Sequence, residues 1–211
     1  MGNTGVVSDE IPEGMSDDAR ASWPSRELID SFLGNFPHDF ELRPGEHLEV
    51  DGDEAQARAR EFRDVLGRYC SGVAVVTTVS GGEPVGMTCQ SFTSVSLDPP
   101  LVAFLPTRQS RAFAAIQRAG HFCVNFLSAD QAGISDRMAS RGDDKFAGVG
   151  WSTSKSGSAL IEGTVGYVDC TVHAVHEAGD HYIVLGRVVD MAVGDDTQPL
   201  LFYRGAYRTT D

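Results

Sequence analysis

Apolar and polar positions alternate over much of the chain beyond residue 70, which is the period of a β-strand with one buried face. The β-branched run VAVVTTV (73–79), the turn SGGEP and the segment VGMTCQSFTSVS (85–96) together predict a hairpin. LVAFL (101–105) predicts a third strand, and HFCVNFL (121–127) predicts a fourth in which aromatic and valine side chains share one face. This part of the chain is therefore expected to form an antiparallel sheet.

The C-terminal third predicts longer strands. The segments GTVGYVDCTVHAVHEAG (163–179) and DHYIVLGRVVDMAVG (180–194) predict a long hairpin with its turn around Glu177–Asp180. LLFYRGAYRTT (200–210) predicts one final strand. Six or seven strands, mostly linked by hairpins, indicate a mainly β protein with short helices, arranged as a closed antiparallel barrel.

Four segments carry apolar residues at helical spacing. They are SRELIDSFLGN (25–35), EAQARAREFRDVLGRYC (54–70), SRAFAAIQRAG (110–120) and SADQAGISDRMASR (128–141). The apolar residues that recur at helical spacing in the second segment are Phe62, Val65, Leu66 and Tyr69. In the third segment, Ser110 is the expected N-cap and Gly120 marks the end of the helix. The segment DDKFAGVGW (143–151) is expected to be a loop.

The net charge of −13 is concentrated in the N-terminal quarter of the chain. Residues 1–57 hold 14 acidic and 3 basic residues, whereas residues 58–211 hold 16 acidic and 14 basic residues. We therefore expect an acidic, partly disordered extension (1–57) followed by a main domain (58–211). Part of the extension either packs on the main domain or docks on a partner. The acidic balance argues against nucleic-acid binding, while the nearly neutral main domain does not exclude a phosphorylated ligand.

The composition is that of an ordinary globular protein, with 41% hydrophobic and 22% charged residues. No apolar run reaches the roughly 18 residues of a membrane helix. The N-terminus lacks the basic and apolar regions of a signal peptide, so we expect a cytoplasmic protein without membrane contact. The four cysteines are far apart, which favours reduced thiols over a zinc site or disulfides. His173 and His176 would face opposite sides of a strand, so no metal site is predicted.

The stretch GMTCQSFTSVSLDPPLVAF (86–104) holds many small hydrogen-bonding side chains for a strand segment. Such a stretch can cradle a phosphate and a flat polar heterocycle through neutral hydrogen bonds and backbone N–H groups. The alternative is a polar edge strand without a ligand. Arg108, Ser110 and Arg111 likewise form either an anion site at a helix N-terminus or an ordinary capped surface helix. His181, at a predicted hairpin turn, is either a surface residue or a site residue at the barrel mouth.

Five segments occur in the order found in the flavin reductase-like family: RYCSGVAVVTT, GMTCQSFTSVSLDPPLVAF, SRAFAAIQRAGHFCVNFLS, DDKFAGVGW and GDHYIVLGRV. The chain resembles this family over residues 60–208, and the resemblance implies the FMN-binding split-barrel fold. It also implies a homodimer with flavin near the subunit interface, and hydride transfer from NADH or NADPH to FMN or FAD. The reduced flavin would then pass to a separate flavin-dependent monooxygenase.

By position, the resemblance places most of the site on the hydroxyl-rich stretch and on the segments beside it. The implied flavin-binding residues are Thr88, Cys89, Gln90, Ser91, Ser94, Val95, Ser96, Ser110, Arg111, Asn125, Phe126, Lys145, Phe146, Tyr203 and Arg204. Ser110 and Arg111 would lie toward the phosphate, whereas Asn125 and Phe126 would offer backbone groups to the ring. His181 is the implied catalytic residue, which would position nicotinamide or help handle the charge of reduced flavin.

Hydride moves between two cofactors in this reaction, so the protein requires no catalytic triad or carboxylate pair, and the sequence displays none. Two other functions on the same fold are open at this point. One is a non-catalytic flavin-binding or partner-docking module. The other is an oxidase of pyridoxamine-phosphate type, which would require a clearer basic phosphate site than the sequence offers.

Overall fold

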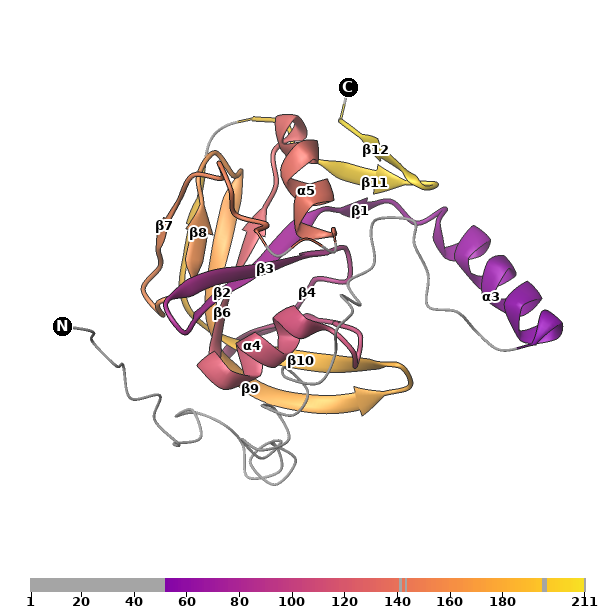
Figure 1. Cartoon of the computed structure of the whole chain (residues 1–211), viewed down its shortest axis with the longest axis horizontal. Coiled ribbons are helices and arrows are strands. Elements are labelled where there is room, and N and C mark those ends of the chain that lie inside the picture. The colour runs from indigo at the N-terminus through magenta and orange to yellow at the C-terminus, as the bar shows by residue number, and fades with distance from the viewer. Residues whose placement is uncertain (1–51, 141, 143, 195–196, 211) are drawn as a thin grey trace.

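The computed structural model describes residues 52–140, 142, 144–194 and 197–210 (Figure 1). The predicted helix at 25–35 and the extension up to residue 51 lie outside the described residues. Seven antiparallel strands form the main sheet. Their spatial order is β3 (Glu83–Cys89), β2 (Ala74–Ser80), β6 (His121–Phe126), β9 (Gly166–Ala178), β10 (His181–Val193), β5 (Pro100–Phe104) and β4 (Thr93–Leu97). The predicted mainly β, antiparallel fold is confirmed.

The two edge strands of this sheet, β3 and β4, follow one another in the sequence. Only Gln90–Phe92 joins them, and four Cα–Cα steps reach at most about 15 Å. A flat sheet would hold its edges roughly 29 Å apart, from six spacings of about 4.8 Å. The sheet must therefore curl into a barrel with a split between β3 and β4. The expectation that residues 85–96 form one return strand was wrong, because this segment crosses from one edge to the other.

Apolar side chains pack in two separate cores, one on each face of the curled sheet. The first contains Phe104 and Phe122, and helix α4 (Arg111–Ala119) adds Phe113 and Ile116 to it. Gly186 belongs to this core, because a Cβ there would lie 2.3 Å from the Phe122 ring. The second core contains buried side chains of Val73, Val75, Leu127, Met138, Val149, Ile161 and Leu200. Both faces of the central strands are thus buried, although their sequences alternate as in a one-sided sheet.

Two elements cover the second core. The short hairpin of β7 (Trp151–Thr153) and β8 (Ala159–Ile161) contributes Ile161. The 3-10 turn η1 (Ala129–Gln131) and helix α5 (Ala132–Met138) contribute Met138. Ser128 forms a capping box with Gln131 at the start of this segment.

Helix α4 matches its sequence prediction closely. The Ser110 hydroxyl accepts a hydrogen bond from the Phe113 N–H at 3.1 Å, and Gly120 ends the helix with φ of 74°. A left-handed residue at this position favours glycine, because other side chains meet the backbone there. Local capping chemistry therefore defines both ends of this helix.

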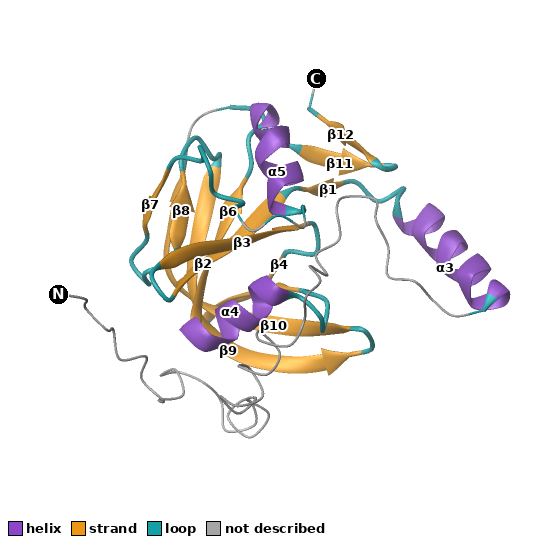
Figure 2. Ribbon diagram, viewed as in Figure 1, coloured by secondary structure: helices purple, strands orange, loops and turns teal. Residues whose placement is uncertain are grey.

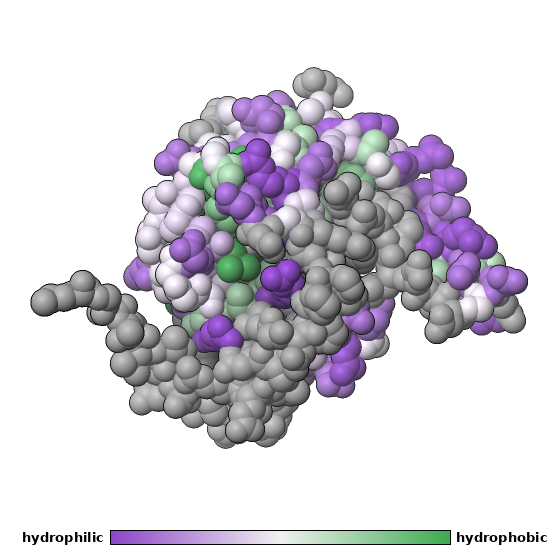
Figure 3. Space-filling view, viewed as in Figure 1, coloured by the Kyte–Doolittle hydropathy of each residue, from purple (hydrophilic) through white to green (hydrophobic). Residues whose placement is uncertain are grey.

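Helix α3 (Asp53–Leu66) ends four residues earlier than predicted and projects from the barrel (Figure 2). Its apolar face does not pack on the described part of the molecule. Phe62 is 65% exposed and Tyr69, just beyond the helix, is 81% exposed. The hydropathy surface displays mainly hydrophilic groups over the visible side of α3 (Figure 3). The helix is amphipathic, as the spacing predicts, but its apolar side lacks a described partner.

The C-terminal segment forms a hairpin and not the single strand that was predicted. Strands β11 (Leu201–Tyr203) and β12 (Ala206–Arg208) join β1 (Ser71–Gly72) in a separate three-stranded sheet. The turn residues Arg204 and Gly205 have φ of 51° and 76°. Two consecutive positive φ values are typical of the type I′ turn, whose twist suits a two-residue hairpin.

No helix among the described residues is long and apolar enough to cross a membrane. Within the same residues, no group of three His, Cys, Asp or Glu side chains is arranged to hold a metal ion. Cys89, Cys123 and Cys170 are buried free thiols, and Cys70 is an exposed one.

Candidate functional site at the split of the barrel

The crossover between β3 and β4 is fixed by hydrogen bonds to the end of β5. The Ser91 hydroxyl donates to the Leu105 carbonyl at 3.1 Å and accepts from the Leu105 N–H at 3.2 Å. Cys89 is buried in the first core, and burial raises the pKa of its thiol, so the thiol stays protonated. A ligand here would therefore meet the backbone of Cys89 and not its sulfur.

The segment that follows β5 brings two distant predicted site residues to the same region. Thr107 forms a β-bridge with His181, and the Arg108 N–H donates to the Asp180 carbonyl at 2.9 Å. Ser110 then caps α4. The crossover, the N-terminus of α4 and the β9–β10 turn are thus connected through residues 105–110.

Strand β4 offers the free polar groups of this region. A bulge lies between Ser94 and Ser96, and it leaves Val95 49% exposed. Among the described residues, the side chains of Gln90, Ser94 and Ser96 have no hydrogen-bond partner. Strand β4 is an edge strand, so one side of its backbone is also unpaired. The two interpretations of this stretch, edge strand and cradle, are therefore compatible.

His181 opens β10 and lies opposite Thr107, in the segment that follows β5. Its side chain is 35% exposed, and its Nδ1 atom lies 2.7 Å from the Asp180 carboxylate. A carboxylate that holds one imidazole nitrogen orients the ring and directs the other nitrogen elsewhere. Nε2 is then the atom that can contact a ligand.

The N-terminus of α4 is less open than the sequence suggests. Ser110 is 2% exposed, and its hydroxyl serves as the helix cap and faces the Met87 sulfur at 3.5 Å. Arg111, the first residue of α4, is half-buried. The side chain of Ser110 therefore has a structural role, and an anion here would meet the helix N-terminus and Arg111.

Three further predicted site residues lie on the α5 side of β3. The Thr88 hydroxyl donates to the Ser135 carbonyl, and Lys145 Nζ donates to the Met138 carbonyl at 3.0 Å. The Phe146 ring fills the space above Gly86, where an added Cβ would lie 3.3 Å from it. The Phe146 side chain thus fills the space that the missing Cβ of Gly86 leaves open. Lys145 and Phe146 therefore lie on one face of β3, whereas Ser110, in the same region as His181, lies against the other face.

Asn125 is completely buried, and its amide is used inside the protein. Its Nδ2 atom lies 3.0 Å from Thr77 Oγ1 and 3.2 Å from the Val75 carbonyl. Its Oδ1 atom accepts from the Ile161 N–H at 2.8 Å. Its backbone lies between β2 and β9, so the offer of free backbone groups to a flavin ring is not supported. Phe126 packs instead against Phe92 of the crossover, with ring centroids 5.2 Å apart.

A second buried polar cluster lies away from the split, under the β7–β8 hairpin. Asp169 accepts hydrogen bonds from the Ser154 hydroxyl at 2.9 Å and from the Ser156 hydroxyl at 2.6 Å. Ser156 and Ser158 are 2.9 Å apart, and Ser158 lies 2.8 Å from His121 Nδ1. Burial lowers the pKa of His121, and the charge of Asp169 partly opposes this shift. This cluster fastens the hairpin to β6 and β9.

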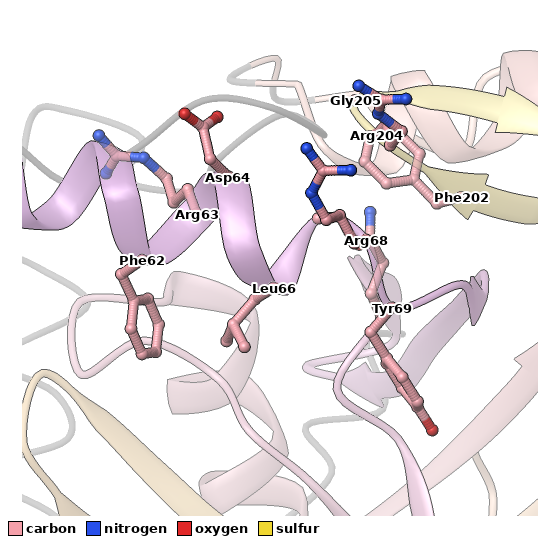
Figure 4. Close-up of a pocket in the computed structure, with 11 residues that line it drawn as sticks. Phe62, Arg63, Asp64, Leu66, Arg68, Tyr69, Phe202, Arg204 and Gly205 are labelled. Carbon is pink, nitrogen blue, oxygen red and sulfur yellow. The ribbon is translucent and has the colours of Figure 1, made fainter.

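Tyr203 and Arg204 lie apart from the split, on the β11–β12 hairpin. Arg204 lines a cavity of about 750 Å³ between this hairpin and the end of α3, shown with its lining residues in Figure 4. Gln90 lines the same cavity, which connects it to the crossover. Arg63, Arg68 and Phe202 also line this cavity, although none of them was predicted as a site residue. Only the two arginines flanking the apolar face of the helix hinted at it.

The fold is a split antiparallel barrel with unpaired backbone edges at β3 and β4. The model of the flavin reductase like domain matches residues 66–211. The chain belongs to this family and is a flavin reductase, which confirms the resemblance noted in the sequence. The matched region begins at the last residue of α3.

Known relatives support the assignment. The chain is 48% identical over 163 residues to the reductase subunit HsaB of a flavin-dependent monooxygenase from Rhodococcus jostii, covering 75% of this chain and 84% of the relative. The crystal structure of nitrilotriacetate monooxygenase component B from Mycobacterium thermoresistibile matches with a TM-score of 0.73 and 48% identity, covering 74% of this chain and 89% of that one. The Streptomyces globisporus NADH:FAD oxidoreductase SgcE6, solved with NAD and FAD fragments, matches with a TM-score of 0.67 and 35% identity, covering 76% and 96%.

Proposed function

We propose that this flavin reductase binds FAD or FMN along the split between β3 and β4, oxidises NADH or NADPH there, and releases reduced flavin to a separate monooxygenase. The observation that carries the location is the group of unpaired donors at the split. Ser94, Ser96 and the free backbone edge of β4 are polar groups without described partners, and the crossover at the start of this strand is bonded to the end of β5, near His181. The names of the relatives, a monooxygenase reductase subunit and an NADH:FAD oxidoreductase, support the reaction.

The residues at the split are better suited to hydrogen-bonding a flat polar ring than to coordinating a metal ion or activating a charged nucleophile. Edge-strand N–H and C=O groups can hydrogen-bond the polar side of a heterocycle, and Val95 offers an exposed apolar contact beside them. Flavin and nicotinamide, when bound, supply the hydride transfer itself. The protein would hold the ring along β4 and restrict water, while His181 Nε2 would donate to or accept from the nicotinamide side. Asp180 keeps that imidazole in place.

We also propose that the protein works as a homodimer. Leu97 of β4 is 95% exposed, and Met191 and Val193 at the end of β10 are 65% and 90% exposed. Large apolar side chains of this kind are typical of surfaces that associate. Light scattering would give the mass of the protein in solution, and a monomer at micromolar concentration would contradict this part of the proposal.

The extension before residue 58 is proposed to be dispensable for the reductase reaction, because the family match begins only at residue 66. A variant that lacks residues 1–50 should keep its turnover number. A loss of folded protein on deletion would instead give the extension a structural role.

The reaction is tested by a turnover panel that crosses NADH and NADPH with FAD and FMN, followed at 340 nm. We expect flavin-dependent loss of absorbance with at least one nucleotide. The S94A/S96A double variant should raise the flavin KM severalfold, since two hydroxyl contacts are lost. The exposed Ser152 of β7 provides the matched control, S152A, which should leave KM unchanged. Tight flavin binding without turnover would favour the non-catalytic flavin-binding module instead.

A further inference from the structure

The cavity between α3 and the β11–β12 hairpin has the size of a small-molecule site. Its volume of about 750 Å³ lies within the roughly 300–1,000 Å³ that such sites occupy. Residues of α3 and the segment after it form one wall, and Phe202, Arg204 and Gly205 form the other. Gln90 of the crossover closes the side next to the barrel. The cavity therefore shares one residue, Gln90, with the crossover of the proposed flavin site.

Three arginines line this cavity: Arg63, Arg68 and Arg204. None of their guanidinium groups has a hydrogen bond or an ion pair in the part of the chain that the structure describes. Asp64 is the only acidic residue of the lining. The main domain is nearly neutral, so three unpaired cations around one cavity are a local excess of positive charge. One guanidinium group can donate two parallel hydrogen bonds to a phosphate, so a phosphorylated ligand is the natural occupant of this cavity.

Aromatic rings accompany these charges. Tyr69 is 81% exposed, and the half-buried Phe202 ring packs edge-on against Tyr207 at 5.6 Å. Figure 4 shows Arg68 beside Arg204 and Phe202, with Tyr69 following Arg68 along the chain. Exposed aromatic rings next to arginines are suited to stacking on a nucleobase, while the arginines hold its phosphates.

The two walls are joined by a short backbone contact. The Arg204 N–H donates to the Gly67 carbonyl at 2.9 Å, so Arg68 and Arg204 stand on either side of one hydrogen bond. Arg204 is the only non-glycine residue with a positive φ among the described residues. Its backbone is thus held in a tight turn, which limits the backbone entropy lost when its side chain binds an anion.

We infer that this cavity binds the adenosine diphosphate half of a dinucleotide. The inference rests on the proposed flavin site, because Gln90 connects the two. The diphosphate would contact Arg68 and Arg204, and the adenine would stack on Tyr69 or Phe202. Two cofactors of the reaction carry this group, FAD and the nicotinamide nucleotide, whereas FMN lacks it. The cavity therefore selects dinucleotides by chemistry that lies outside the reacting rings.

Binding is tested first with ADP alone, by isothermal titration of the full-length protein. The wild type should bind ADP, and adenosine should bind about tenfold more weakly because it lacks the phosphates. The R68Q/R204Q double variant should lose about tenfold in ADP affinity. R60Q is the matched control, since Arg60 lies on α3, is exposed and does not line the cavity. Y69A tests the stacking contact without altering the charge.

Kinetics then distinguish the two sources of the group. If the cavity holds FAD, the double variant raises the KM for FAD about tenfold and leaves that for FMN unchanged. If the cavity holds the nicotinamide nucleotide, the KM for NADH rises with either flavin. ADP that fails to bind the wild type, or binds the double variant equally well, would overturn the inference. So would dissociation of an oligomer in the double variant with unchanged ADP affinity, because the cavity would then be a protein interface.

These outcomes are separable from failure of the proposed function. A protein that binds ADP but never oxidises NADH would refute the reaction and not the cavity. If the protein is a normal reductase and R60Q and R68Q/R204Q have identical KM values, the proposed binding of adenosine diphosphate in the cavity is refuted, and the proposed reaction is not. Thermal melting of each variant establishes that the comparison concerns folded proteins.

Discussion

The Nδ1 atom of His181 lies 2.7 Å from the Oδ1 atom of Asp180, at the turn that joins β9 to β10. The turn itself is bonded to the loop after β5, because the Arg108 N–H donates to the Asp180 carbonyl. The imidazole is thereby fixed beside the loop after β5 although it stands at the tip of a long hairpin.

The first prediction concerns this histidine. H181A should raise the KM for the nicotinamide nucleotide more than that for flavin, because Nε2 faces the proposed nicotinamide side. D180N should have a smaller effect in the same direction, since it weakens the orientation of the ring and not its contact. Steady-state kinetics with each substrate varied in turn provide the measurement. The exposed His176 offers the control H176A, and equal effects of H176A and H181A would remove His181 from the site.

The second prediction separates the cap of α4 from phosphate binding. S110A should lower the free energy of unfolding by about 1 kcal/mol, because it removes the N-cap. S110D should restore the cap and the stability, yet its negative charge should raise the flavin KM if the phosphate lies at this helix end. Urea unfolding and flavin kinetics on the same samples are sufficient. An unchanged flavin KM in S110D would place the phosphate elsewhere.

The third prediction concerns Asn125. Replacing it by alanine leaves the Ile161 N–H and the Thr77 hydroxyl with fewer partners inside the second core. N125A should therefore cost about 2–4 kcal/mol of stability. Its flavin KM, measured well below the melting temperature, should stay near the wild-type value. Q90A should show the reverse pattern, and a large rise in flavin KM for N125A would argue that Asn125 belongs to the site.

The fourth prediction is a dependence of stability on pH. Burial lowers the pKa of His121 below its ordinary value of 6.5, so the unfolded chain binds a proton more readily than the folded one. The stabilising contribution of neutral His121 is fully present above pH 6.5 and is lost as the pH falls toward the lower pKa of the folded state. Urea unfolding at several pH values between 7.5 and 5 should give a shallower slope for H121N than for the wild type. H176N, at an exposed position, should retain the wild-type slope.

Signals that are local in the sequence predicted the structure well. The ends of α4 were predictable because a serine cap and a left-handed glycine act within one helical turn. The β9–β10 hairpin was predictable from its alternation and its Gly179–Asp180 turn. The path of residues 85–96 was not, because the crossing at Gln90–Phe92 depends on pairing with β5, and no turn residue marks it.

The site was predictable to a similar extent. Ser110 and His181 are 71 positions apart in the sequence, and the loop after β5 brings them to the same region through the contacts of Thr107 and Arg108. The complete burial of Asn125 was not predictable, because alternation indicates two faces of a strand and cannot tell that both are buried. The exposure of Phe62 was also beyond the sequence, since helical spacing identifies an apolar face without identifying what covers it.

The crossover of three residues has a mechanical consequence. It holds the end of β3 within about 15 Å of the start of β4, so the separation of the two edges at this point is limited by chain length and not by side-chain size. Side chains of β3 and β4 can change without altering this maximum separation. One inserted residue between Cys89 and Thr93 would let the edges move apart by up to about 3.8 Å.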